Sequence, residues 1–406
     1  MRHQRVAATV GVVCVAGLAL AGCTGGGAKG TSTSGSGRPG SGIGAKRTQV
    51  YTFGVVGSNG KILQLEHQKP TVVAGIPGSV VQIATSNSDT YALTSEGTVW
   101  AWGAGRTGEL GDGTTTDFVA SPVRVRFPTG VRISSLPNPM PFDAGLAIDS
   151  RGRAWGWGDD HALCLRAAQA LFPKRLPFTH VTLASGAGGH ALFDSDGRVY
   201  ACGEGTDGEL GDGSTRSSLV PVAVIGLPRH LRVKSLESSW QDSGALMTNG
   251  SYYDWGFNEE GQLGDGTTRN RSVPVRVRLP GFAVRVSQGG SLGNNGQTLA
   301  ILADGSVWAW GDGQWGQLGT GRLQDALAPV EVTIPPDVTF DQVMSGGYAC
   351  YAIGRNGALW AWGRNQFGEL GDATRLPIQL TPAPVGVRLT RVSSTASNVA
   401  GFYRRR

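Results

Sequence analysis

Apolar and turn-forming residues follow one layout along most of the chain. Seven short segments each contain an apolar run, a turn dipeptide that ends in glycine, and a second apolar run. The turn glycines are Gly60, Gly97, Gly152, Gly197, Gly250, Gly305 and Gly357. Dipeptides such as Asn-Gly or Asp-Gly between alternating apolar residues are a strong hairpin signal, because both central positions of a two-residue turn need positive φ. Each segment is therefore predicted to form one β-hairpin.

The second strand of these hairpins carries a recurring pair of large side chains. In Trp100-Ala101-Trp102 the two indoles are two positions apart, so they share one face of a strand. The corresponding triplets begin at Trp155, Tyr200, Tyr253, Trp308 and Trp360. Nine of the eleven tryptophans occupy such positions, and we predict that they pack neighbouring repeats together.

The spacing of the repeats predicts the architecture. After a shorter first interval the turns recur about every 45 to 55 residues, a period typical of propellers and solenoids. Residues 50–80 begin in mid-repeat and residues 386–403 supply an opening strand. Pairing the two ends in one blade would remove exposed sheet edges. We predict an all-β fold, a seven-bladed β-propeller over residues 49–406, whose N- and C-terminal strands are neighbours and close one blade.

The N-terminus has the pattern of a secretion signal. Residues 1–22 contain Arg2 and Arg5 and then an apolar run of about fifteen residues, fewer than the roughly twenty that a helix needs to cross a bilayer. The sequence Leu-Ala-Gly-Cys that ends at Cys23 resembles the bacterial lipobox. That resemblance implies a lipoprotein signal peptide and a lipidated Cys23; the alternative is a plain secretion signal with a chance cysteine.

Residues 23–48 form a Gly/Ser-rich linker that contains too little apolar surface to fold. A chain of about 25 such residues has a typical reach of roughly 25 to 30 Å. We expect a protein held at the extracytoplasmic face of the cell membrane by a lipid anchor and a flexible tether.

Composition and charge change this picture little. The 64 glycines and the charged fraction of 16% indicate a turn-dense, strand-rich protein. Lys and Arg number 36 against 30 Asp and Glu, so loss of Arg2 and Arg5 leaves 34 − 30 = +4. The basic residues are scattered through the repeats, and we therefore expect no nucleic-acid partner. We also expect a monomer.

A loop that follows the triplets makes the repeat recognisable. Sequences such as TGELGDG and EGQLGDG begin at residues 107, 207, 260, 315 and 367, and a Pro-Val pair follows each. Together with the hairpin and the Trp-Gly that precedes the loop, this resembles the repeat of the regulator of chromosome condensation family. The resemblance implies a seven-bladed propeller of four-stranded blades.

The chain departs from the family pattern in two places. The second blade replaces the loop with residues 159–177, for which a short helix is one alternative. The family's histidines before the hairpin strand are mostly missing, with only His190 close to that position. Both departures weaken the transfer of a particular partner site, but not of the fold.

The chain shows no recognisable catalytic or cofactor motif. Gly-x-Gly-x-x-Gly recurs at the repeat period and opens a turn between strands, so we interpret it as structural. Asp112, Asp212, Asp265 and Asp372 recur once per blade, where turn hydrogen bonding is a better explanation than calcium binding. Asp159-Asp160-His161 is interpreted as a solvated loop. We expect no enzyme activity, catalytic residue, metal or cofactor.

Three cysteines remain beyond the signal and the lipidation site, at positions 164, 202 and 350. Their spacing indicates no disulfide framework. Either Cys164 and Cys202 form a bridge between adjacent blades, or all three are small buried hydrophobic residues, and the sequence leaves both possibilities open.

Regular blades with variable loops are most simply a scaffold that binds a protein in the cell envelope or outside the cell. Aromatic residues on variable loops often anchor interfaces, and we predict a protein-binding face formed by Phe142, Trp240, Trp315 and Phe367. The alternative is that each packs locally beneath its own loop.

The family resemblance implies one further function, and the competing class is enzymatic. Propeller-type β-lactamase inhibitor proteins share this repeat type, which implies an inhibitor of a secreted enzyme such as a β-lactamase. The other alternative is a cell-wall or carbohydrate-acting enzyme. Clustered carboxylates with raised pKa values at the ring centre would favour the enzyme.

Overall fold

The computed structural model describes most of the chain after the predicted linker. It describes residues 48–54, 57–58, 61–62, 70–159, 161–165, 169–291, 295–366, 368–372, 374, 376–395 and 398–404. They belong to one compact unit that extends over residues 44–406. The predicted signal peptide, the lipidation site Cys23 and all but the last residue of the linker lie outside the described residues. No long apolar helix that could span a bilayer occurs among the residues described.

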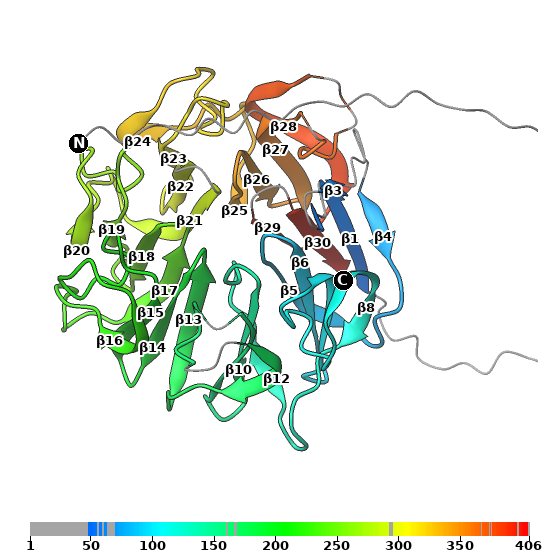
Figure 1. Ribbon diagram of the computed structural model, residues 1–406. Coiled ribbons are helices and arrows are strands. Elements are labelled where there is room, and N and C mark those ends of the chain that lie inside the picture. The colour runs from blue at the N-terminus through cyan, green and yellow to red at the C-terminus, as the bar shows by residue number, and fades with distance from the viewer. Residues whose placement is uncertain are drawn as a thin grey trace, which may run out of the picture. The chain divides into compact units, whose positions relative to one another are not determined.

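Seven four-stranded antiparallel sheets are arranged as blades around a common centre (Figure 1). The described residues contain strands and turns and no helix. This confirms the prediction of an all-β, seven-bladed propeller.

The first three blades follow each other along the chain. Blade 1 contains β5 (Val80–Thr85), β6 (Asp89–Thr94), β7 (Val99–Gly105) and β8 (Thr116–Arg124). Blade 2 contains β9 (Ile133–Ser135), β10 (Ala144–Asp149), β11 (Ala154–Gly158) and β12 (Ala170–Arg175). Blade 3 contains β13 (Val181–Ala187), β14 (His190–Ser195), β15 (Arg198–Gly203) and β16 (Ser218–Ala223).

The next three blades repeat the arrangement. Blade 4 contains β17 (Val233–Ser238), β18 (Asp242–Met247), β19 (Tyr252–Gly256) and β20 (Arg271–Arg276). Blade 5 contains β21 (Ala283–Ser291), β22 (Asn295–Leu302), β23 (Val307–Gly311) and β24 (Ala326–Glu331). Blade 6 contains β25 (Phe340–Ser345), β26 (Ala349–Gly354), β27 (Ala358–Arg364) and β28 (Ile378–Arg388).

Blade 7 joins the two ends of the propeller. Its strand order is β29 (Arg391–Thr395), β30 (Asn398–Arg404), β1 (Thr48–Gly54) and β4 (Thr71–Val73). Strands β1 and β30 are antiparallel, and their register runs from Thr48 opposite Arg404 to Gly54 opposite Asn398. The predicted closure by N- and C-terminal strands is confirmed. A separate two-stranded ribbon is formed by β2 (Gly57–Ser58) and β3 (Lys61–Ile62).

The core lies between the blades and depends on the second large residue of each triplet. Trp157, Trp255, Trp310 and Trp362 are completely buried. The indole N–H of Trp157 donates to the Glu109 carbonyl of the preceding blade at 2.7 Å, and Trp255 and Trp362 bond to Glu209 and Gln317 in the same way at 2.8 Å. The prediction that these tryptophans pack neighbouring repeats is confirmed.

The hairpin turns differ from the prediction. At most of them the loop has three residues, as at blade 1, where Gly97 N–H donates to Thr94 O at 3.0 Å and only Gly97 has positive φ (78°). A type I turn followed by one left-handed glycine gives this geometry. The predicted two-residue turn occurs at Asp196-Gly197, where φ is 53° and 75°. The sequence signal located the turns but not their length.

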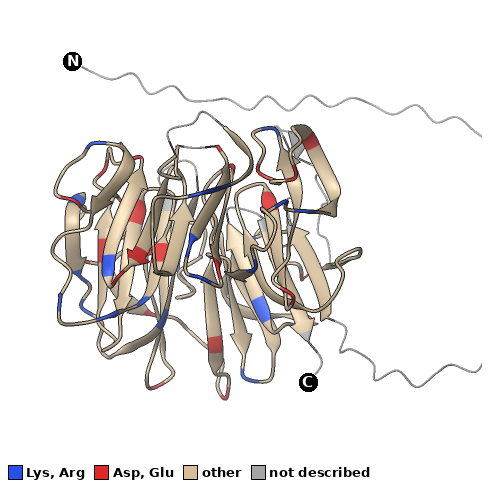
Figure 2. Cartoon of the chain, turned by 90° about the horizontal axis from the view of Figure 1, so that it is seen from below, with Lys and Arg blue, Asp and Glu red and all other residues tan. Residues whose placement is uncertain are grey.

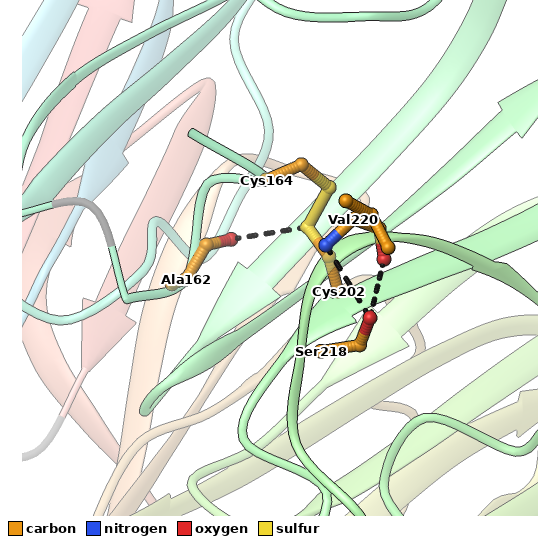
Figure 3. The surroundings of a disulfide bond; sticks show 5 residues. All are labelled: Ala162, Cys164, Cys202, Ser218 and Val220. Carbon is orange, nitrogen blue, oxygen red and sulfur yellow. Dashed lines mark hydrogen bonds between the residues drawn. A yellow bond between two sulfur atoms is a disulfide. The ribbon is translucent and has the colours of Figure 1, made fainter. Parts of the chain in front are cut away.

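The atypical loop of blade 2, for which a short helix is one alternative, contains no helix in its described residues 159, 161–165 and 169–177. Its end is β12, and a disulfide joins Cys164 to Cys202 of blade 3 (Figure 3). Cys202 occupies the triplet position where five other blades carry a tryptophan, three of which, Trp157, Trp255 and Trp362, donate the hydrogen bond described above. The smaller side chain leaves room for the loop, and a covalent bridge replaces the hydrogen bond. Cys350 is a buried free cysteine.

Candidate protein-binding face

Two kinds of loop meet at one end of the blades. Because the strands alternate in direction, the loops after the first and third strands leave at the same end of each sheet. We call this end the loop face, and the opposite end, with the hairpin turns and the connections between blades, the turn face. Lysine, arginine, aspartate and glutamate residues are distributed over several blades (Figure 2).

Phe142 and Trp240 meet at the centre of the loop face. Their ring centroids are 4.9 Å apart with the planes at 72°, an edge-to-face contact. They border a depression of about 20 Å³ whose lining comes from six of the seven blades. Both side chains are half-buried. The structure thus unites two of the four predicted aromatic residues, which lie 98 positions apart in the sequence.

The backbone holds this pair in place. Phe142 N–H donates to Gly188 O at 3.0 Å. Gly188 has φ of +54°, and a Cβ there would lie 2.1 Å from Trp240 O, so only glycine allows the two loops to approach this closely. Gln241 Nε2 donates to Asp207 Oδ2 at 3.1 Å and ties the Trp240 loop to blade 3. We call Phe142 and Trp240 the central aromatic pair.

Trp315 belongs to a second cluster, which the sequence analysis found only in part. Its ring centroid lies 6.3 Å from that of Tyr348, and the Arg364 guanidinium is 3.8 Å from the Tyr348 centroid and 5.7 Å from that of Trp315. Arg364 Nε donates to Glu369 Oε1 at 2.9 Å. We call Trp315, Tyr348 and Arg364 the outer aromatic cluster. Phe367 lies outside the described residues.

Tyr348 was missed because it lies one position after the variable residue that was compared between the blades. Asp242 and Ala349 pair with the triplet glycines Gly256 and Gly363, so Gly347 corresponds to Trp240 and Tyr348 to Gln241. Extending that comparison by one residue would have found a third aromatic side chain. Arg364, at the end of β27, gave no such signal, since a single arginine beside a turn is common on surfaces.

Buried carboxylates also gather below the loop face, in positions that the sequence analysis did not single out. Asp89, Glu109 and Asp143 place one oxygen each within 4.8 Å of the others. Burial is the main cause that raises the pKa of Asp143 to about 6, and the charge of Glu109 adds to it. Burial also raises the pKa of Asp89 and Glu109. Three oxygens are fewer than the six to eight ligands that Ca²⁺ takes.

A second group of carboxylates lies in blade 4. Gln288 Nε2 donates to Asp242 Oδ2 at 3.0 Å and to Asp254 Oδ1 at 2.7 Å. Burial, followed by the charges of neighbouring carboxylates, raises the pKa of both aspartates. Both are buried between strands, so a bulky substrate has no direct access to them.

The aspartates that recur in the loops have the turn role that the sequence predicted. Asp112 Oδ1 accepts bonds from Thr114 N at 3.0 Å and Thr114 Oγ1 at 2.7 Å. Asp265 and Asp372 accept equivalent bonds from Thr267 and Thr374, and Asp212 accepts one from Ser214 N. In the atypical loop, Asp159 contacts His161 Nδ1, and the imidazole is 74% exposed.

Comparison with known proteins agrees with this geometry. The profile of the Regulator of chromosome condensation (RCC1) repeat matches residues 96–136, 196–246, 249–293 and 304–353. The Ultraviolet-B receptor UVR8 of Arabidopsis thaliana is 27% identical over 315 residues, which cover 75% of this chain and 70% of UVR8. The mitochondrial RCC1 domain-containing protein RUG3 of the same plant is 30% identical over 310 residues, which cover 72% of this chain and 67% of RUG3.

A solved structure shows the same fold. Prp20p of Saccharomyces cerevisiae superimposes with a TM-score of 0.75 at 18% identity, covering 89% of this chain and 93% of Prp20p. The repeats, the closed ring of seven blades and these relatives agree, and the chain belongs to the regulator of chromosome condensation (RCC1) repeat family.

Proposed function

We propose that this protein is a lipid-anchored, extracytoplasmic scaffold that binds a partner protein through its loop face. The central aromatic pair carries the proposal. Two large rings, half-buried and fixed by backbone contacts, lose little conformational freedom on binding, which is the property of interface anchors. The outer aromatic cluster, with Arg364 stacked on Tyr348, would extend the same interface.

Family members support binding over catalysis. UVR8 is named a receptor, and Prp20p binds Gsp1p and histones. These partners belong to those proteins. What this chain shares with Prp20p is the fold, so its own partner follows from its own loops and compartment.

Two observations support the proposed compartment. Residues 1–23 have the charged start, apolar run and terminal cysteine of a lipoprotein signal. The Cys164–Cys202 bridge suits an oxidising environment, because disulfides are rare in reducing compartments.

Capture from a cell-envelope extract followed by a binding measurement tests the proposal. We expect the mature chain to retain a partner and Trp240→Ala to weaken its binding by about 2 kcal/mol, roughly 30-fold. Trp315→Ala should weaken it as well. Phe172→Ala is the matched control, because Phe172 is 48% exposed on the outer strand β12 and belongs to neither cluster. Equal affinity of all four proteins would reject this face.

Inhibition of a secreted enzyme is one form of the same proposal. A loop face with a rigid aromatic anchor is suited to blocking the entrance of an active site. Adding the mature chain to a β-lactamase and measuring hydrolysis tests this form directly. Full activity at saturating protein would reject it.

Acid-base catalysis is the second candidate, favoured by the raised pKa values of Asp89, Glu109 and Asp143. Their burial argues against it, since Asp89 is 0% and Glu109 2% exposed. Release of sugars from cell-wall material that is lost in Asp143→Asn would support an enzyme. Release that is absent in the native chain would leave the scaffold as the better explanation.

A further inference from the structure

The turn face contains a cavity that the proposed scaffold function does not use. Its volume is about 910 Å³, and it lies among blades 5, 6 and 7. The side chains that matter here are Arg285 of β21, Arg355 of the blade 6 turn, Arg388 of β28, Arg391 of β29, Asp341 and Tyr403.

The lining carries an excess of positive charge. Four arginines and one aspartate give +4 − 1 = +3. Arg355 Nε lies 3.6 Å from Asp341 Oδ1, whereas the other three guanidinium groups form no ion pair with any residue that the structure describes. Partial burial lowers the pKa of Arg391, and the charge of Arg285 lowers it further. Arg285 and Arg391 therefore repel each other, and a bound anion would relieve the repulsion.

The surface continues into a neighbouring depression of about 390 Å³, which adds Lys234, Val284 and Asp304, so cations still outnumber carboxylates in its lining by three to two. Lys234 Nζ donates to Val284 O at 2.9 Å. Phe282, which directly precedes β21, is 68% exposed, and Val284 is 38% exposed. An exposed aromatic ring beside lysine and arginine is typical of surfaces that contact a bilayer, since the ring enters the headgroup region while the cations remain at its edge.

The chain enters the propeller at the edge of this surface. Thr48 pairs with Arg404, and the adjacent Gln49 pairs with Tyr403, which lines the cavity. About 25 residues separate Thr48 from Cys23, a reach of roughly 25 to 30 Å for a flexible linker. A lipid on Cys23 would therefore keep the turn face close to the membrane.

We propose that Lys234, Arg285, Arg355, Arg388 and Arg391 bind the phosphate headgroups of anionic phospholipids while the ring of Phe282 enters the headgroup region. This membrane-facing cluster would direct the turn face toward the bilayer and present the loop face to its partner. The inference goes beyond partner binding and rests on the proposed membrane location.

Co-sedimentation with vesicles tests the proposed lipid binding. The protein used is the mature chain without its lipid, residues 24–406. All described strands lie within these residues, so the closed ring is retained. We expect vesicles that contain about one quarter phosphatidylglycerol to bind the chain roughly tenfold more tightly than phosphatidylcholine vesicles, and binding to fall as salt screens the charges. Arg285→Gln with Arg391→Gln should remove most of that preference, and Phe282→Ser should weaken it.

Two variants serve as controls. Arg229→Gln removes an exposed arginine that lines neither cavity and should bind vesicles like the native chain. Arg391→Lys keeps the charge and should retain most of the binding. Because the double variant relieves a repulsion, its thermal midpoint should be equal to or above that of the native chain. Should it fail to fold, Arg388→Gln, at the exposed end of β28, replaces it.

Three outcomes would overturn the proposal. One is equal binding to the two kinds of vesicle, and another is full phosphatidylglycerol binding by the double variant. The third is calorimetric binding of inorganic pyrophosphate that the double variant loses while no vesicle binds, which would assign the site to a soluble anion. None of these substitutions lies on the loop face, so failure here leaves partner capture intact and can be distinguished from failure of the scaffold proposal.

Discussion

Gly188, which has no side chain, determines the position of Trp240 in the central aromatic pair. It belongs to blade 3, yet its missing Cβ creates the space for the Trp240 carbonyl of blade 4. The central aromatic pair thus depends on a contact between two loops, and a sequence reading that follows one repeat at a time does not find such a contact.

Gly188→Ala should weaken partner binding by roughly tenfold although both aromatic rings remain. The added Cβ would displace the Trp240 backbone, and the positive φ alone costs about 1 kcal/mol of stability. Gly226→Ala is the matched control, because φ there is +87° but the nearest atom to a Cβ is 3.9 Å away. Urea unfolding and partner titration of both variants measure the two effects. Equal loss of stability and of affinity in the two variants would contradict the clash at Gly188.

Glu237 makes the fold sensitive to pH. It is buried in β17, where desolvation raises its pKa from 4.5 to about 8, and Ser235 Oγ donates to its carboxyl group at 2.7 Å. Because the folded pKa lies above the unfolded value, the folded state binds the proton more tightly. The contribution to stability is therefore present at low pH and is lost as the pH rises from about 4.5 through about 8.

Glu237→Gln removes this titration. Between pH 5 and pH 8 the native chain should lose roughly 3 to 4 kcal/mol more of its unfolding free energy than the variant does. Thermal unfolding at several pH values checks this result, with the exposed Glu331→Gln as control. Parallel pH profiles of the native chain and Glu237→Gln would show that Glu237 does not titrate in this range.

Among the elements, the hairpins could be located from the sequence, but the lengths of their turns and the contacts between loops could not be predicted. The turn glycines and the tryptophan triplets report local geometry, which recurs in each blade. The length of each turn depends on the backbone conformation of the residue before its glycine. Among the described residues at that position, only Asp196 adopts the left-handed conformation that a two-residue turn requires. The contact between Phe142 and Trp240 forms only when the blades are arranged in a ring. The sequence pattern therefore predicted both residues but not that they contact each other.

The atypical loop of blade 2 is held by its disulfide. The bridge closes 38 residues, which in the chain-entropy model corresponds to about 3 to 4 kcal/mol of stability. A reducing agent should lower the melting temperature of the native chain. The Cys164→Ala, Cys202→Ala double variant should melt at the lower temperature with or without reductant. A native chain that is insensitive to complete reduction would show that packing around the buried Leu163 holds the loop without the bridge.

In the whole molecule, the number of blades and the closure followed from counting repeats and reading the two ends. That inference succeeded because each end of the chain contains an incomplete repeat. In a ring, each incomplete repeat can be completed only by the other. The membrane-facing cluster could not be found this way, since its arginines come from three blades and are far apart in the sequence.

Removal of residues 398–406 should abolish the cooperative fold. The deletion takes β30 away from between β29 and β1, which leaves β1 without its main partner and exposes two strand edges. We expect aggregation in size-exclusion chromatography and loss of a single thermal transition. A chain that begins at residue 44 serves as control and should unfold like the full-length protein. Monomeric, cooperative behaviour of the C-terminal deletion would show that six blades suffice.

The pairing of Thr48 with Arg404 also sets an order of events during synthesis. The first strand of the propeller to leave the ribosome, β1, finds its partner β30 only after that last strand has been made. Throughout that interval β1 presents an unmatched edge to its surroundings. A chain of this design must therefore be kept from premature pairing until its final residues arrive.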